Sequence, residues 1–146
     1  MKEHRGDMWA VRADAHVITT NGSVRKDGAA VMGRGCALEA KRRYPGIEYK
    51  LGYRIRRFGN TVQLFSSEAL IALPVKHLWH QKADLALIER GLAQLVALVD
   101  ETYGIAASIA MPRPGCGNGG LRWADVWPVV TSLLDDRFTV CDYAPA

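Results

Sequence analysis

Apolar and polar positions alternate along the chain in blocks that predict a series of strands and helices. Apolar residues at three- and four-residue steps over 83–99 predict an amphipathic helix, and two further helices are predicted at 36–44 and 122–134. Short apolar runs bounded by turn-forming residues predict buried strands at 15–20 (AHVITT), 68–73 (EALIAL), 106–111 (AASIAM) and 137–141 (RFTVC).

A hairpin is predicted just before the second of these strands. Residues 51–57 and 61–65 have the composition of two strands and flank Phe58-Gly59-Asn60, which is typical of a turn. This stretch predicts some antiparallel pairing, whereas strands that alternate with helices are typical of layered α/β domains. We therefore expect a layered α/β domain with a mixed sheet.

Two segments of the chain repeat the order strand, glycine-rich loop, helix. The loops are 21–35 (NGSVRKDGAAVMGRG) and 115–120 (GCGNGG). Glycine lets backbone N–H groups approach a ligand closely, and N–H groups beside a helix N-terminus form an anion site. Two such loops at one sheet edge could hold a diphosphate from both sides. Alternatively, the glycines only make tight turns, and neither loop matches the Walker or dinucleotide-binding patterns.

Composition and charge narrow the possibilities only slightly. The 146 residues fit a single domain, 1–146, and 49% apolar with 23% charged residues is typical of a globular protein. A net charge of +4 is compatible with an anionic ligand and equally with an ordinary solvated surface. Three widely spaced cysteines form no disulfide framework and no zinc signature.

We expect a cytoplasmic protein, because the start of the chain is charged and the cysteines show no disulfide pattern. No apolar run approaches the length of a membrane span, so no membrane partner is expected. Nothing in the sequence demands more than a monomer, and we expect neither a cofactor nor a bound metal.

Several of these segments resemble macrodomains, a family that binds ADP-ribose. VMGRGCALEAKRRYPG (31–46) is similar to the family's first ligand loop and helix, and GDMW (6–9) stands at its Gly-Asp-hydrophobic motif. LPVKHLWHQKADLALIERGLAQL (73–95) and MPRPGCGNGGLRWADV (111–126) resemble one branch of the family. That branch contains the terminal ADP-ribose protein glycohydrolases and the DNA ADP-ribosyl glycohydrolase antitoxins. The resemblance implies a three-layer α/β/α sandwich with ADP-ribose across the carboxyl ends of the strands.

The resemblance also implies roles for individual residues. Asp7 would accept a hydrogen bond from the adenine amino group, and Asn21 would lie near the distal ribose. Trp123 could form the floor of the cleft or equally belong to the core. The two loops would enclose the diphosphate and the distal ribose. The implied ligand-binding residues are Asp7, Met8, Asn21, Met32, Gly33, Arg34, Gly35, Pro114, Gly115, Cys116, Gly117, Asn118, Gly119, Gly120, Leu121 and Trp123.

Lys76 is the candidate catalytic residue, because in the resembling branch a lysine at this position acts near the anomeric carbon of the distal ribose. It could form a Schiff-base-type adduct with the opened sugar, which needs the neutral amine, or it could steady the leaving group. A surface lysine at a strand end is the alternative. His77 and His80 could supply a general base, but we assign them no role.

Two positions depart from the branch. Val75 replaces a threonine that often precedes the lysine, and Gly119 stands where the terminal glycohydrolases place a catalytic aspartate. A mechanism that needs this aspartate therefore does not transfer. The glycine is shared with the DNA-directed relatives. Cys116 is interpreted as a small residue that fills a tight loop, not as a nucleophile.

The function predicted from these observations is removal of ADP-ribose from a macromolecule, either DNA or protein. Two alternatives within the family stay open: a non-catalytic reader of ADP-ribose, and a phosphatase acting on ADP-ribose 1″-phosphate. Outside the family, a generic nucleotide- or RNA-binding domain would fit. The basic runs at 41–43 and 54–57 could contact nucleic acid, although solvated surface charges explain them as well.

Overall fold

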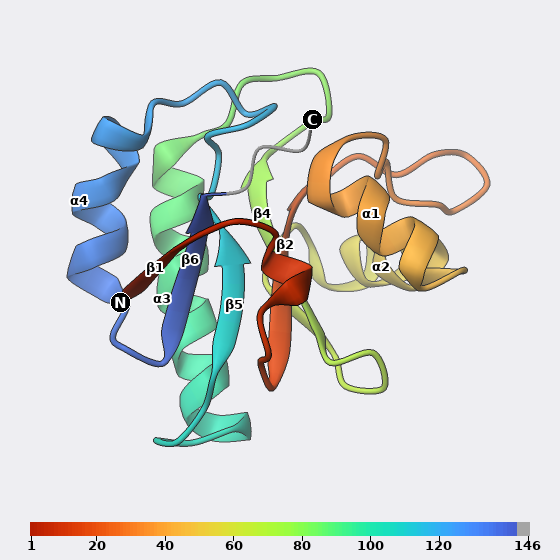
Figure 1. Ribbon diagram of the computed structural model, residues 1–146. Coiled ribbons are helices and arrows are strands. Elements are labelled where there is room, and N and C mark those ends of the chain that lie inside the picture. Colours follow the sequence, from red (N-terminus) through yellow and green to blue (C-terminus); the bar gives the residue numbers. More distant parts are fainter. Residues whose placement is uncertain (143–146) are drawn as a thin grey trace.

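A sheet of six strands forms the centre of the computed structural model, which describes residues 1–142, and helices cover both faces of the sheet (Figure 1). In spatial order the strands are β1 (Lys2–Arg5), β6 (Phe138–Asp142), β5 (Ile109–Pro112), β2 (Ala15–Asn21), β4 (Leu70–Lys76) and β3 (Gln63–Phe65). The helices are the short 3₁₀ helix η1 (Met8–Ala10), α1 (Gly35–Arg43), α2 (Ile47–Phe58), α3 (Leu85–Thr102) and α4 (Trp123–Leu133).

The sheet is mixed, as predicted. The first five strands in this order are paired in parallel, and only β3 runs antiparallel to its neighbour β4. The carboxyl ends of the five parallel strands therefore meet at one edge of the sheet. At that edge the pairing of β2 and β4 shifts register after Thr20, and Asn21 lies beside Lys76.

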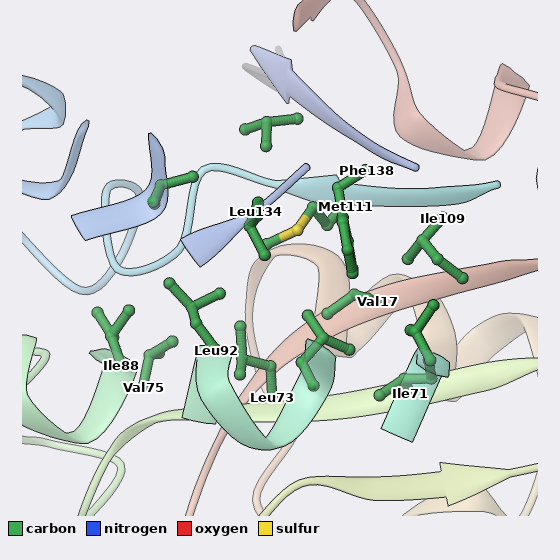
Figure 2. Close-up of a cluster of buried hydrophobic side chains, with 14 of the residues drawn as sticks. Val17, Ile71, Leu73, Val75, Ile88, Leu92, Ile109, Met111, Leu134 and Phe138 are labelled. Carbon is green, nitrogen blue, oxygen red and sulfur yellow. The ribbon is translucent and has the colours of Figure 1, made fainter. Parts of the chain in front are cut away.

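One face of the sheet packs against α3 and α4. Figure 2 shows how side chains from the strands meet those of α3 in a continuous apolar cluster. The predicted helical face is confirmed, because Leu87, Ile88, Leu92, Leu95 and Val99 are all buried. Each fully buried side chain of this size contributes about 1.5–3 kcal/mol through removal of apolar surface from water.

The opposite face of the sheet is covered by η1, α1 and α2. A second apolar cluster joins Met8 of η1, Ala40 of α1 and Leu51 of α2 to Ile18 and Ala72 of the strands. In Figure 1, α1 and α2 accordingly lie to the right of the sheet, away from α3 and α4. The fold is a three-layer α/β/α sandwich, as the resemblance implied.

The predicted hairpin at 51–65 is wrong in its first half, because 51–57 belongs to the helix α2. Ile47 and Leu51 are buried on successive turns and Ile55 is partly buried, so the sequence follows a helical period. Tyr53, whose side chain would have faced the core in an alternating strand, is 66% exposed. The second half of the prediction contains the observed strand β3. The sequence pattern predicts neither β1, whose four residues are all exposed, nor η1.

Candidate functional site

A cleft of about 1400 Å³ opens along the carboxyl ends of β2, β4, β5 and β6. Both glycine-rich loops contribute to its walls, together with the segment between β4 and α3. Its lining residues are 19–21, 23–25, 31–37, 75–76, 79–82, 112–113, 115–121, 123 and 141–142. The cleft therefore lies at the sheet edge where parallel α/β folds bind ligands.

The first loop leads into the N-terminus of α1 at the cleft. The N-cap residue Arg34 makes no capping hydrogen bond through its side chain, so the first N–H groups of α1 are not capped by that side chain. Gly35 has a φ of 58°, a left-handed conformation that favours glycine. The helix dipole and these N–H groups form a site suited to an anion.

The second loop faces the first across the cleft. A Cβ added to Gly35 would lie 3.2 Å from Nδ2 of Asn118, which shows how closely the two loops approach. The second loop folds on itself, since Leu121 donates its N–H to Gly115 O at 2.9 Å. It is also fixed to the start of the α3 segment, because Ala83 donates its N–H to Gly119 O at 2.9 Å. The two loops thus form opposite walls of one narrow groove.

Gly119 is enclosed by its surroundings. A Cβ at this position would lie 2.5 Å from Gly115 O and 2.8 Å from Cβ of Ala83. A side chain of any size would therefore require the loop to move. An aspartate, which the resemblance places here in the terminal glycohydrolases, would therefore not fit the loop as it is folded in this structure.

Lys76 is the last residue of β4 and lines the cleft between the two loops. Its Nζ donates to Trp79 O at 3.3 Å, and its carbonyl accepts a hydrogen bond from Nδ2 of Asn60 at 2.9 Å. Asn21 is the neighbour of Lys76 on β2. The side-chain amide of Asn21 donates to Val31 O at 3.0 Å and accepts the N–H of Ser23 at 2.9 Å, so it holds two parts of the first loop together. Lys76 is thus held on a strand end, with its ammonium among polar cleft residues.

The two histidines beside this lysine have different surroundings. Nε2 of His77 lies 2.7 Å from Oδ2 of Asp84, so its side chain is directed to the start of α3. This hydrogen bond is the main reason that the pKa of Asp84 is below its ordinary value. His80 lines the cleft and packs edge-on against Trp79, with ring centroids 5.4 Å apart. Of the two, only His80 lines the cleft.

None of the cysteines near the cleft has an activated thiol. Burial raises the pKa of Cys116 to about 11, and burial also raises the pKa of Cys36 and of Cys141. A thiol with such a pKa is almost wholly protonated at neutral pH and is a poor nucleophile. This agrees with the interpretation of Cys116 as a residue that fills the loop.

The charges that line the cleft are mainly positive. Its cationic side chains come from the first loop, the end of β4, the segment before α3 and the residue after β5, and are Arg25, Arg34, Lys76, Lys82 and Arg113. The only carboxylate among the lining residues within 1–142 is that of Asp142. Nη1 of Arg113 lies 3.5 Å from that carboxylate, and its guanidinium lies over the ring of Trp123 at 4.7 Å. Such a cleft attracts anionic ligands.

Three of the residues implied by the resemblance do not line the cleft. Asp7 caps η1 by accepting the N–H of Trp9 at 2.9 Å, and Met8 is fully buried in the core. Asp7 and Met8 follow Gly6, which donates its N–H to Asp142 O at the end of the cleft. Pro114 is buried within the second loop.

The remaining implied residues are brought together around the cleft: Asn21, Met32, Gly33, Arg34, Gly35, Lys76, Cys116, Asn118, Leu121, Trp123 and the glycines at 115, 117, 119 and 120. Further lining residues were not predicted from the sequence, among them Ser23, Arg25, Lys82 and Arg113. Ser23 and Arg25 belong to the first loop, and Arg113 directly follows a strand, so loop membership and strand ends were the signals that could have found them.

Within residues 1–142 no group of three or more His, Cys, Asp or Glu side chains is placed to hold a metal ion. None of the helices described there is long and apolar enough to cross a membrane.

A mixed six-stranded α/β/α sandwich with a cleft between two glycine-rich loops is the architecture of a macrodomain. No protein-family model matches the chain. The macrodomain of Mycobacterium tuberculosis DarG is similar to it over 99% of this chain and 97% of that one, with a TM-score of 0.78 and 30% identity. The chain belongs to the macrodomain family, in the branch of the DarG macrodomains.

Two further similarities concern longer proteins. The DNA ADP-ribosyl glycohydrolase of Mycobacterium tuberculosis is 35% identical over 130 residues, which is 83% of this chain and 35% of that protein. The chain thus spans about a third of the length of the curated relatives that it matches. The structure of Thermosipho africanus DarTG in complex with ADP-ribose has a TM-score of 0.76 and 22% identity, covering 99% of this chain and 42% of that one.

Proposed function

We propose that this chain binds ADP-ribose in the cleft and hydrolyses the bond between ADP-ribose and a DNA base. The observation that carries the proposal is the position of Lys76 on a strand end, beside a groove formed by two glycine-rich loops. The relatives named as DNA ADP-ribosyl glycohydrolases and the neighbour solved with ADP-ribose support it.

In the proposed complex the diphosphate lies at the N-terminus of α1, along the groove between the two glycine-rich loops. Backbone N–H groups then supply most of the contacts, assisted by the helix dipole. The adenine would lie toward Asp7 and Met8, and the distal ribose toward Asn21 and Lys76. This orientation brings the anomeric carbon to the only lysine on a strand end that lines the cleft.

Lys76 has two possible roles at the anomeric carbon. As a neutral amine it would attack C1″ of the opened sugar and form a Schiff-base-type adduct, while the bond from C1″ to the base breaks and the base leaves with a proton; water would then hydrolyse the adduct and release ADP-ribose and the free amine. As an ammonium it would stabilise the negative charge that develops on the departing base. Arginine keeps a positive charge and is not deprotonated in proteins, so the Lys76→Arg variant separates the two roles.

The test measures release of ADP-ribose from ADP-ribosylated single-stranded DNA and from ADP-ribosylated protein. We expect release from DNA by the wild type and a loss of at least about 100-fold in Lys76→Ala, as for removal of a catalytic group. If the amine is the nucleophile, Lys76→Arg is equally inactive and borohydride traps a covalent adduct on the wild type. Lys2→Ala, on the exposed strand β1, is the matched control and keeps full activity.

A non-catalytic reader is the second candidate, and one observation favours it. Among residues 1–142 the only carboxylate that lines the cleft is that of Asp142, and it lies 3.5 Å from Nη1 of Arg113, so this part of the chain offers no carboxylate without a cationic partner as a general base. A reader would bind ADP-ribose in calorimetry and release nothing from any substrate. Release from DNA that does not change in Lys76→Ala would contradict the role proposed for the lysine.

A further inference from the structure

The outer face of α2 carries aromatic and basic side chains on successive turns. Tyr49 is 49% exposed and Tyr53 is 66% exposed, and Arg56 and Arg57 are also exposed. At 100° per residue, Tyr49, Tyr53 and Arg56 fall within one narrow stripe of the helix, and Arg57 lies at its edge. The core-facing side of α2 is formed by Ile47 and Leu51. None of the four exposed residues is therefore needed for the packing of the core.

This face is continuous with the wall of the cleft. Nη2 of Arg56 donates to Arg25 O at 2.7 Å, and Arg25 itself lines the cleft. The loop that carries Arg25 lies directly on α2, because a Cβ on Gly52 would overlap the carbonyl oxygen of Gly28. A chain that leaves the cleft past Arg25 would therefore reach the exposed stripe of α2 without crossing another element.

The charge of the surface favours a polyanion. Arg25, Lys26, Arg56 and Arg57 are all exposed. The acidic groups on the same surface are Asp27, which accepts hydrogen bonds from Ala29 N and the Tyr49 hydroxyl, and the half-buried Glu48. Four cations against two carboxylates leave this surface with an excess of positive charge.

We infer that this face of α2 binds the single-stranded DNA on one side of the modified nucleotide. Tyr49 and Tyr53 lie about 6 Å apart along the helix axis, and each ring can stack on a base that is not paired. Arg56 and Arg57 lie beyond Tyr53, beside Arg25, and would contact the phosphates between the cleft and the base on Tyr53. Duplex DNA offers no unstacked bases to the tyrosines, so the surface favours a single strand. As a role in substrate recognition, this inference rests on the proposed function.

The experiment measures fluorescence anisotropy of an unmodified single-stranded oligodeoxynucleotide of about 12 nucleotides, a length that one such surface can span. We expect Tyr53→Ala to weaken binding about tenfold, as for loss of one stacked base. Arg57→Ala is expected to lower the slope of log affinity against log salt by about 0.7, as for loss of one phosphate contact. Phe58→Ala is the matched control, because Phe58 is 60% exposed on the same helix but lies off the stripe. Arg90→Ala, on α3 across the sheet, is the control for charge.

Calorimetry with free ADP-ribose separates this inference from the proposed function. Tyr53→Ala should bind ADP-ribose as the wild type does and lose only affinity for the strand. The inference is overturned if the wild type binds no oligonucleotide, or if Tyr53→Ala and Phe58→Ala bind it equally. Equal binding of duplex and single strand would overturn the stacking role. Stronger binding to anionic lipid vesicles would show that the face serves a membrane surface instead.

Discussion

Gly119 shows how one residue without a side chain determines the shape of the second loop. A Cβ at this position would lie 2.5 Å from Gly115 O and 2.8 Å from Cβ of Ala83, and the Gly119 carbonyl accepts the N–H of Ala83 at 2.9 Å. We predict that Gly119→Ala lowers the free energy of unfolding by about 1–3 kcal/mol, as expected when an extra methyl group is forced into a packed site. Urea denaturation measures this change, and calorimetry should show weaker binding of ADP-ribose.

Gly117 provides the matched control in the same loop. A Cβ there meets nothing within 4 Å, and Gly117 is not among the glycines with positive φ. Both substitutions restrict the unfolded chain equally, so their difference reports the native loop alone. Equal stabilities of Gly117→Ala and Gly119→Ala would show that the loop yields to a side chain at position 119, and the steric explanation for the missing aspartate would fail.

At the scale of elements, Asp84 connects the segment after Lys76 to the start of α3. Its side chain accepts the N–H of Ala86 at 3.0 Å and contacts His77, while its own N–H bonds Val75 O at 2.9 Å. We predict that Asp84→Ala lowers the free energy of unfolding by about 1 kcal/mol, as for loss of an N-cap. Asp84→Asn, which keeps a capping oxygen, should lose less.

The pH dependence of stability tests the same contact. The pKa of Asp84 is lowered in the folded state, mainly by the hydrogen bond with His77. A depressed carboxyl pKa stabilises the fold above the unfolded value of about 3.9, and this stabilisation disappears as the pH falls through the lower, folded pKa. Urea denaturation between about pH 6 and pH 3 measures this effect. The difference in free energy of unfolding between the wild type and Asp84→Asn should become smaller toward the acid end of that range. A constant difference would contradict this assignment.

The elements with a strong apolar period were predictable from the sequence, and those defined by their neighbours were not. α3 buries five apolar residues on one face, so its period is unambiguous. In α2 the helical series Ile47, Leu51 and Ile55 competes in the sequence with the alternation of Leu51, Tyr53 and Ile55. The structure follows the helical series, which buries Ile47 and Leu51, and places Gly52 against Gly28. β1 has no apolar pattern, because it is an exposed edge strand paired only with β6.

The candidate site was predictable to the extent that it is made of backbone. The two glycine-rich loops that follow strands predicted both walls of the cleft, and the end of a strand predicted the position of Lys76. The side chains that complete the cleft depend on tertiary contacts instead. Arg113 lines the cleft while it lies over Trp123, ten residues further along the chain, and pairs with Asp142 of another strand. No local pattern contains such a contact.

For the whole molecule, the decisive property is where its positive charge lies. The net charge is only +4, but five cationic side chains and a single carboxylate line the cleft. ADP-ribose carries its negative charge on the diphosphate, so the field of the cleft should increase the rate of association more than it slows dissociation. We predict that the association rate falls several-fold when the ionic strength rises from about 0.01 M to 0.15 M, where the screening length shortens from about 30 Å to 8 Å.

Two charge reversals show whether the cleft or the whole protein produces this field. Lys82→Glu changes a residue that lines the cleft, whereas Arg12→Glu changes an exposed residue before β2, at the opposite end of that strand. Both alter the net charge by the same amount. Stopped-flow measurement should show slower association and a weaker salt dependence in Lys82→Glu only. Equal slowing by both variants would mean that net charge alone attracts the ligand. If the association rate of the wild type does not depend on salt, the charges of the cleft do not attract the ligand, and the backbone N–H groups of the two loops recognise it instead.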